Sequence, residues 1–298
     1  KELQESVKQR IERRTNEFGT KEPIIQTMGN SQIQIQLPGE KDVQRAKELI
    51  LKTAYLTFQI VAGPDEQTSL IMAIDKHFKG DFKNRLMRPG LNEGDHVQVP
   101  MEQIGKVRDM IVEVQGVEGI IPKDKVVALS RAPRPGEPQH YLLYFLNKDT
   151  IMTGDGLTMA VARPDDQKGG GQWEILFGLN AESGRDFGDR TELNKGQLMA
   201  IVVDGVVESA PQINDRITTS GVISGTFTSE EARALAIALN SGSLPVPVSE
   251  QQTGIGRPNH RSRIGAALRQ APDRSVAAPP SRSDVETIGP THNIAAQS

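Results

Sequence analysis

The sequence comprises 298 residues, more than one average domain, and this length leaves room for two compact units. Its 35 Lys and Arg residues, set against 38 Asp and Glu residues, exclude the strong positive charge with which proteins bind nucleic acid. The lack of cysteine excludes disulfide frameworks, thiolate metal sites and cysteine nucleophiles. The longest apolar run, residues 198–207, is too short to cross a bilayer.

The first 62 residues predict a small sheet with helices packed on it. Leu3, Val7 and Ile11 recur four residues apart and place an apolar stripe on a first helix. The alternating Ile and Leu residues of QIQIQL predict a strand with one buried face. In chain order we expect a helix, a hairpin, a second helix and a strand, over residues 3–18, 22–39, 43–50 and 54–61.

This order lacks one strand of a βαββαβ unit, the ferredoxin-like arrangement in which two helices cover one face of an antiparallel sheet. We expect that strand to precede Lys1 in a longer parent protein, because the sequence begins without Met and without the apolar centre of a secretory signal. The expected fold class is therefore α+β, with residues 1–62 as a ferredoxin-like unit.

A second domain is expected to begin where Gly63-Pro64 interrupts the strand pattern. Asp204-Gly205 is expected to form a hairpin turn between two apolar strands. Thr228 and Glu231 form a capping box, which predicts a helix that ends near Gly242. The other expected elements are strands over residues 141–146, 173–179 and 244–248 and a helix over residues 180–193.

The last residues, 249–298, form the third predicted region. They are rich in Gly, Pro, Ser, Arg and Ala and have no helical or strand periodicity. Such a composition cannot bury enough apolar surface to form a core. We therefore expect a low-complexity tail that is mostly disordered.

Several segments resemble the extracytoplasmic region of SecD proteins, which belong to the Sec protein-export machinery. The first is RRTNEFGTKEPIIQTMGNSQIQIQLPG followed by AKELILKTAYLTFQIV. The second comprises IMTGDGL, LMAIVVDGVVESAPQI and ISGTFTSEEARALAIALNSGSLPVPV. The resemblance covers roughly residues 1–61 and 150–250.

The resemblance implies an inner-membrane subunit that works with SecF and the SecYEG channel and uses the proton gradient to help pull or hold preprotein. This region would lie on the periplasmic side and would reach the membrane only through helices outside this sequence. Its implied architecture is a ferredoxin-like base, residues 1–62, with a larger head, residues 63–248, inserted into it. Its implied partners are unfolded preprotein, SecF and SecYEG.

Such a module needs a joint between base and head and a surface that accepts many unfolded sequences. The expected joint lies where the chain enters and leaves the head, and the hinge candidates are Gly63, Pro64, Leu244, Pro245, Val246, Pro247 and Val248. The candidates for preprotein contact are flexible methionines of the head, Met72, Met87, Met101 and Met110. The alternative for the hinge candidates is that they are plain connectors, and the alternative for the methionines is that they fill the core.

The sequence shows no catalytic or cofactor motif, so we expect neither an enzyme nor a bound cofactor or metal. The five histidines, His77, His96, His140, His260 and His292, have no metal-ligand spacing. The acidic residues Asp155, Asp165, Asp166 and Glu182 lie in frames typical of solvated loops. Gly169 to Gln172 lacks the Lys-Ser/Thr of a phosphate loop, and Trp173 is expected to pack in a sheet.

Two other functions remain to be compared with protein export. A ferredoxin-like regulatory domain that senses a ligand would place a small-molecule cleft between two such units. A hydrolase or other enzyme would need a nucleophile, a base and an orienting group, and the sequence offers no such set.

Overall fold

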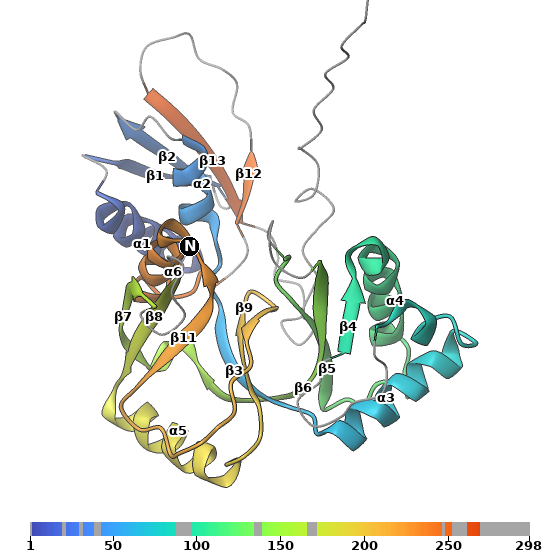
Figure 1. Ribbon diagram of the computed structural model, residues 1–298. Coiled ribbons are helices and arrows are strands. Elements are labelled where there is room, and N and C mark those ends of the chain that lie inside the picture. The colour runs from blue at the N-terminus through green and yellow to red at the C-terminus, as the bar shows by residue number, and fades with distance from the viewer. Residues whose placement is uncertain are drawn as a thin grey trace, which may run out of the picture.

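The computed structural model describes residues 2–19, 22–29, 32–38, 43–87, 97–133, 139–165, 172–245, 248–251 and 261–268. It shows an α+β fold in which a small base of sheet and helices lies against a larger head, as predicted (Figure 1). Among the described residues, none of the helices combines the length and apolar character needed to span a membrane.

The base is a four-stranded antiparallel sheet with helices on it. Its elements are α1 (Glu2–Phe18), β1 (Ile24–Met28), β2 (Gln32–Pro38), α2 (Val43–Leu51), β12 (Val248–Gln251) and β13 (Arg261–Leu268). The strand order is β1-β2-β13-β12. Val7 and Ile11 of α1 pack on Ile33, Ile35 and Leu37 of β2, and all five are fully or almost fully buried. The helix and hairpin predictions for this segment are confirmed.

Strand β13 lies within residues 249–298, the region expected to be mostly disordered. Residues 261–268 form a strand between β2 and β12, antiparallel to both. In a βαββαβ sheet this place belongs to the strand that comes before the first helix. The first and second strands of that unit are separated by one position in the sheet, and the third strand fills it. Here β13 takes that place. Residues 252–260 and 269–298 of the expected tail lie outside the described residues.

Two expectations about strands are wrong. Strand β3 (Leu56–Val61) forms as predicted, but it pairs with strands of the head instead of completing the base sheet. The strand expected over residues 244–248 begins only at Val248, because Leu244 is buried at the junction with the head and Pro245 lies in a bend. Val246 and Pro247 lie outside the described residues.

The head is organised around a closed ring of five strands. β3 pairs with β9, β9 with β10, β10 with β5, β5 with β6, and β6 pairs again with β3. The bounds of the other four are β5 (Lys125–Ser130), β6 (His140–Thr153), β9 (Met199–Val203) and β10 (Val206–Ser209), and β4 (Val97–Pro100) extends the sheet beside β6. Small and branched apolar side chains such as Ala128, Ala200 and Val202 pack together on one side of these strands.

Helices cover one side of this ring and a second sheet covers another. α3 (Pro64–His77) and α4 (Ile104–Gly116) lie on the side of β4 and β6 (Figure 1). The second sheet has the order β11-β8-β7. Its strands and the helices beside it are β7 (Leu157–Pro164), β8 (Trp173–Leu179), α5 (Ala181–Leu193), β11 (Ser220–Phe227) and α6 (Ser229–Asn240). Single 3-10 turns occur at Lys83–Arg85, Met101–Gln103 and Gly154–Gly156.

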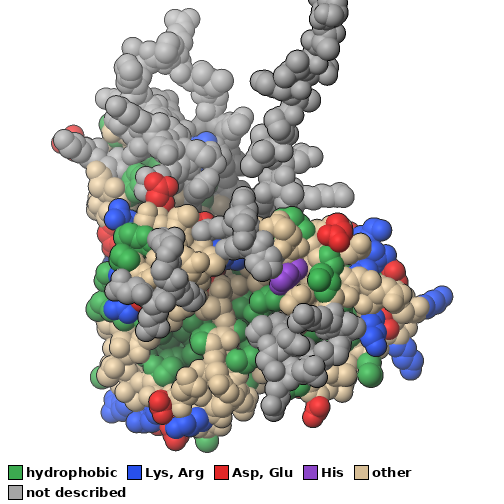
Figure 2. Space-filling view, in the orientation of Figure 1, with side chains coloured by type: hydrophobic (Ala, Val, Ile, Leu, Met, Phe, Trp, Pro, Cys, Tyr) green, Lys and Arg blue, Asp and Glu red, His purple; other side chains and the backbone are tan. Residues whose placement is uncertain are grey.

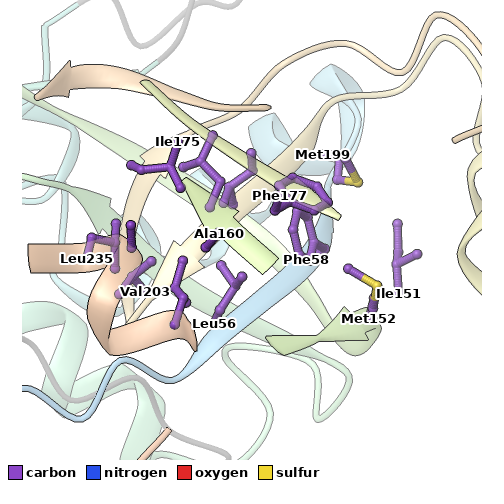
Figure 3. Packing of buried hydrophobic residues seen from close by; sticks show 14 of the residues in the cluster. Leu56, Phe58, Ile151, Met152, Ala160, Ile175, Phe177, Met199, Val203 and Leu235 are labelled. Carbon is purple, nitrogen blue, oxygen red and sulfur yellow. The ribbon is translucent and has the colours of Figure 1, made fainter. Parts of the chain in front are cut away.

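The largest core lies between the ring and the second sheet (Figure 3). Phe58 of β3 contacts Phe177 of β8 and Phe187 of α5, with ring centroids 5.4 and 5.3 Å apart. Such tilted and edge-to-face aromatic pairs add to the energy of area burial alone. This core ties the two sheets of the head into one body.

Local sequence signals in the head are confirmed. The side chain of Asn180 accepts a hydrogen bond from the Ser183 N–H at the start of α5. Thr228 and Glu231 form both bonds of the predicted capping box. Asp204 and Gly205 both have positive φ, 53° and 82°, as the tight hairpin turn between β9 and β10 requires.

Candidate functional site

The chain passes between base and head at two places, which we call the junction. Residues 52–55 lead from α2 into β3, and residues 241–247 lead from α6 back to β12. The two passages lie side by side, since the Leu244 N–H donates to the Thr53 carbonyl at 2.9 Å. Any displacement of the head relative to the base has to be absorbed here.

One side chain, Arg14 of α1, holds both passages. It is completely buried, and its guanidinium donates to Ser241 Oγ at 2.9 Å, to the Ile50 carbonyl at 3.0 Å and to the Gly242 carbonyl at 3.1 Å. Its further acceptors are the carbonyls of Leu49, Lys52 and Thr53. Arginine suits this place because its rigid fork of five N–H donors can bind several carbonyls at once.

The electrostatics of Arg14 also suit the site. Its acceptors lie at the C-terminal ends of α2 and α6, where aligned peptide dipoles favour a positive charge. Burial nevertheless lowers the pKa of Arg14 to about 10, while the nearby charge of Asp204 acts in the opposite direction. The hydrogen bonds therefore offset a real desolvation cost, and losing them would leave an uncompensated buried charge.

Asp204 joins the head to the same passage from the other side. Its carboxylate accepts hydrogen bonds from the N–H groups of Ala54, at 3.0 Å, and Tyr55, at 2.8 Å. The Asp204 N–H in turn donates to the Tyr55 carbonyl at 3.0 Å. Ala54 has φ 53°, a left-handed conformation that costs energy for a residue with a Cβ. The β9–β10 turn thus holds a strained residue of the passage in place.

Helix α6 belongs to both units. Leu235 and Leu239 pack into the large core of the head, whereas Ala234 and Ile237 pack against the core of the base. The spacing of two apolar faces around one helix explains this double role. Together with Arg14 and Asp204, α6 makes the junction a continuous packed structure.

The predicted hinge residues fall on both sides of the junction. Gly63 caps α3 and Pro64 is its first residue, so both lie within the head, beyond β3. Leu244 and Pro245 lie in the second passage, and Val248 begins β12. Arg14 and Asp204 were not among the candidate residues predicted from the sequence, although Asp204 was expected in a turn. A signal for Arg14 was present, since Val7, Ile11 and Arg14 share one face of α1.

The four candidate methionines differ in exposure. Met72 on α3 is 59% exposed, Met87 beside β4 44% and Met101 after β4 40%. Met110 is only 8% exposed and packs in the core beneath α3 and α4. Figure 2 also shows a hollow in the centre of the head with hydrophobic side chains on its floor. The exposed methionines can meet another chain, whereas Met110 fills the core.

Those acidic and histidine residues considered above that the structure describes do not gather at one site. His77 contacts Glu113 at 2.9 Å on the surface, and Asp155 lies 3.4 Å from the hydroxyl of Thr153. Asp166, His96, His260 and His292 lie outside the described residues. In the part of the chain that the structure describes, no three His, Cys, Asp or Glu residues are grouped so that they could hold a metal ion.

A surface cavity of about 400 Å³ lies at the end of α4, between the following loop and the start of β5. Lys123 and Lys125 line it, but each is paired with a glutamate, Glu118 at 3.0 Å and Glu66 at 2.8 Å. The cavity lies within the head and not between two ferredoxin-like units. It therefore gives no support to the ligand-sensing alternative.

Comparison with known proteins matches this architecture. The model described as "SecDF, P1 head subdomain" matches residues 126–246, and the model described as "Protein translocase subunit SecDF, P1 domain, N-terminal" matches residues 4–63. This chain belongs to the SecD/SecDF family. The two SecD matches fall on the head and on the base with the first strand of the head, so the SecD resemblance seen in the sequence is confirmed.

Individual SecD relatives agree. The SecD of Elusimicrobium minutum (strain Pei191) is 33% identical over 266 residues, covering 87% of this chain and 48% of that protein. The SecD of Desulfurispirillum indicum (strain ATCC BAA-1389 / DSM 22839 / S5) is 35% identical over 241 residues, covering 80% of this chain and 38% of that protein. The chain thus spans about half or less of the length of these SecD relatives.

Solved SecDF structures show the same fold. A structure titled "Crystal structure of SecDF in Super-membrane-facing form" matches with a TM-score of 0.53 and 28% identity, over 83% of this chain and 27% of that one. A second, "Structure and function of a membrane component SecDF that enhances protein export", matches with a TM-score of 0.52 and 28% identity, over 83% of this chain and 90% of that one. The chain therefore has the architecture of the P1 region of SecDF.

Proposed function

We propose that this chain is the periplasmic region of a SecD-type subunit and that its head holds segments of preprotein as they leave the SecYEG channel. In the whole protein, acting with SecF, proton movement through the membrane part would turn the head on the base. The region needs no catalytic group for this task. Membership of the SecD family supports the export role, and the SecDF relative whose title states that it enhances protein export supports it further.

The junction is the observation that carries this proposal. A large body, residues 56–240, is joined to a small one by two adjacent passages, one buried guanidinium and the shared helix α6. Motion concentrated in a few residues at element ends is the usual geometry of a hinge. We propose residues 52–55 and 241–245 as the hinge, which retains Leu244 and Pro245 from the sequence candidates and replaces Gly63 and Pro64.

Site-specific photocrosslinking in inner-membrane vesicles tests the substrate role. A crosslinker is placed at Met72, Met87 or Met101 of the full-length protein while a preprotein is arrested in the channel. We expect crosslinks to the preprotein from at least one of these exposed positions. Met110 is the matched control, because its buried side chain cannot reach another chain. If no exposed position of the head crosslinks to the preprotein, the proposal that the head holds preprotein is refuted.

A further inference from the structure

The three-stranded sheet of the head has two edges that are treated differently. At the β7 edge, Asn240 of α6 accepts from the Ala160 N–H at 2.7 Å and donates to the Ala160 carbonyl at 3.0 Å. The carboxamide thus takes the place that a neighbouring strand would occupy. β7 also ends in Arg163 and Pro164, residue types that discourage strand pairing. This edge is closed to another chain.

The hydrogen-bond pattern then shows which groups of β11 point outward. Since the Ala160 N–H and carbonyl face away from β8, those of Val161 face β8, where Val161 pairs with Leu176. The N–H and carbonyl of Leu176 therefore point toward β7. Because these groups alternate along a strand, the N–H and carbonyl groups of Ile175 and Phe177 point toward β11. By the same alternation, Ser220 and Val222 direct their N–H and carbonyl groups to the free edge.

These outward groups of β11 have no hydrogen-bond partner among the described residues. The open stretch is bounded at both ends. The Leu179 N–H donates to the Thr219 carbonyl at 2.8 Å, and Arg131 donates to the Thr226 carbonyl at 2.6 Å. A register shift between Ile223 and Phe227 bends the strand before that second boundary. The unpaired edge that is left before this bend runs from Ser220 to Val222.

The β11 edge also lacks the usual protection. Its sequence, SGVISGTF, contains no charged residue and no proline, and its small residues leave room for another backbone to approach. In Figure 1, β11 lies on the side of the sheet nearer β3 and β9, and β7 lies on the outer side. The open edge therefore faces the centre of the head, where Figure 2 shows the hollow with hydrophobic side chains.

The sheet face beside this edge offers adaptable apolar contacts. Val161, Leu176 and Val222 form one row across the three strands. Val161 is 48% exposed and its neighbour Met159 is 41% exposed. The opposite face of the same strands is rigid, because Ile175, Phe177 and Ile223 are buried in the large core. A strand added here would meet a fixed backbone and a permissive side-chain surface.

We propose that the β11 edge of the head binds an extended segment of unfolded polypeptide as an additional strand. This inference rests on the proposed function and names the part of the head that holds the preprotein. Main-chain hydrogen bonds to Ser220 and Val222 supply affinity that is independent of sequence, as in other cases of strand addition. The apolar row adds a preference for segments with alternating apolar side chains and no proline.

The test uses the whole 298-residue chain and a short labelled peptide of alternating Val and Lys residues. An analogue of this peptide with N-methyl groups on alternate backbone amides cannot donate to a strand edge. We expect the analogue to bind about tenfold more weakly, since it loses hydrogen bonds in a partly desolvated site. Hydrogen exchange should show new protection of the Val222 N–H with the unmodified peptide, while the Ala160 N–H, already bonded to Asn240, stays unchanged.

Variants of the chain sharpen the result. Ser220→Pro removes one outward N–H without removing a bond to β8, because the Ser220 N–H points away from β8. Proline is tolerated at such an edge position. We expect it to weaken peptide binding five- to tenfold, whereas Ser220→Ala, which keeps the N–H, should bind like the parent chain. If Ser220→Pro fails to fold, Val222→Lys serves as the test variant. It adds a charge of the kind that protects strand edges, and it should weaken peptide binding.

The possible failures are distinct. If the peptide and its N-methylated analogue bind equally and the Val222 N–H gains no protection, the proposal that the β11 edge binds the peptide is overturned. The proposed function is not affected by that result, because it is tested by crosslinking at the head. No peptide binding, with no crosslinks from any head position, overturns both. Binding by the parent chain that Ser220→Pro and N-methylation both reduce supports the edge.

Discussion

The base and the head of this chain are assembled in opposite ways. The head is formed by one continuous stretch, residues 56–240, whose strands close into a ring and share an aromatic core with a second sheet. The base combines α1, β1, β2 and α2 with β12 and β13, which follow the entire head. The head thus contains most of its own support, whereas the base depends on contacts between distant segments and on α6, which it shares with the head.

This difference indicates where rigidity and freedom lie. A body with its own core can move as a unit, and the strain of its movement falls on the junction. The junction is held by hydrogen bonds to one buried arginine, a directional arrangement that is sensitive to loss of a single partner. The following changes test whether the head is self-supporting and whether the junction is the weak place.

The largest effect is expected in the head core, from Phe58→Ala. The Phe58 ring is fully buried between Phe177 and Phe187, and truncation leaves a cavity that should lower the free energy of unfolding by about 4 kcal/mol. Urea unfolding monitored by far-UV circular dichroism measures this change. Phe58→Leu, which keeps most of the volume, should cost far less. Equal losses in both variants would mean that packing around the ring does not support the head.

Arg14→Ala is expected to cost about 3 kcal/mol, because it strands buried carbonyl and hydroxyl groups at the ends of two helices. Hydrogen exchange should increase at the Gly242 and Leu244 amides before it increases in β3 or β9. Arg14→Lys keeps the charge but not the fork, so an intermediate loss is expected. Uniformly faster exchange throughout the head would contradict the separation of junction and head.

Tyr144 provides a pH test within the ring. Burial raises the pKa of Tyr144 to about 12, whereas an unfolded tyrosine ionises near its ordinary value of 10. The folded state therefore keeps the proton longer, and this stability is present below pH 10 and lost as pH rises from 10 through 12. We expect a loss of about 2 kcal/mol over that window, measured by urea unfolding. Tyr144→Phe removes this group, and an identical alkaline profile for the variant would refute the assignment.

The smallest effect is expected at the cap of α6. Thr228→Ala removes the side-chain acceptor for the Glu231 N–H and should cost about 1 kcal/mol. Thermal unfolding measures the change, and Thr228→Ser, which keeps the hydroxyl, serves as the control. Because α6 packs in both cores, we expect the loss to appear in base and head together. A loss confined to the head would show that the shared helix does not couple them.

The sequence predicted what depends on neighbouring residues. The caps at Asn180 and Thr228 and the turn at Asp204-Gly205 are set by local hydrogen bonds and backbone conformation, and all three formed as expected. The alternation of Ile33, Ile35 and Leu37 likewise reported a buried strand face. The family resemblance added the insertion of a larger head into the ferredoxin-like base, which periodicity alone did not provide.

Pairings between distant segments were not accessible in this way. The apolar pattern of β3 states that it is buried but not by which sheet, and it pairs with β9 and β6 instead of the base. β13 lies in a polar, low-complexity segment whose composition predicted disorder. Gly63-Pro64 marked the start of a helix, because such residues signal local breaks and carry no information about domain borders.

Strand β13 has a consequence for synthesis on the ribosome. The first fifty residues emerge early, but two strands of the base sheet, β13 beside β2 and β12 beyond it, come from residues 248–268. The apolar face formed by α1, α2 and β2 must therefore wait, partly uncovered, while nearly two hundred intervening residues are translated. A nascent chain arrested once α6 has left the ribosome should contain a folded head beside an unfinished, protease-sensitive N-terminal segment.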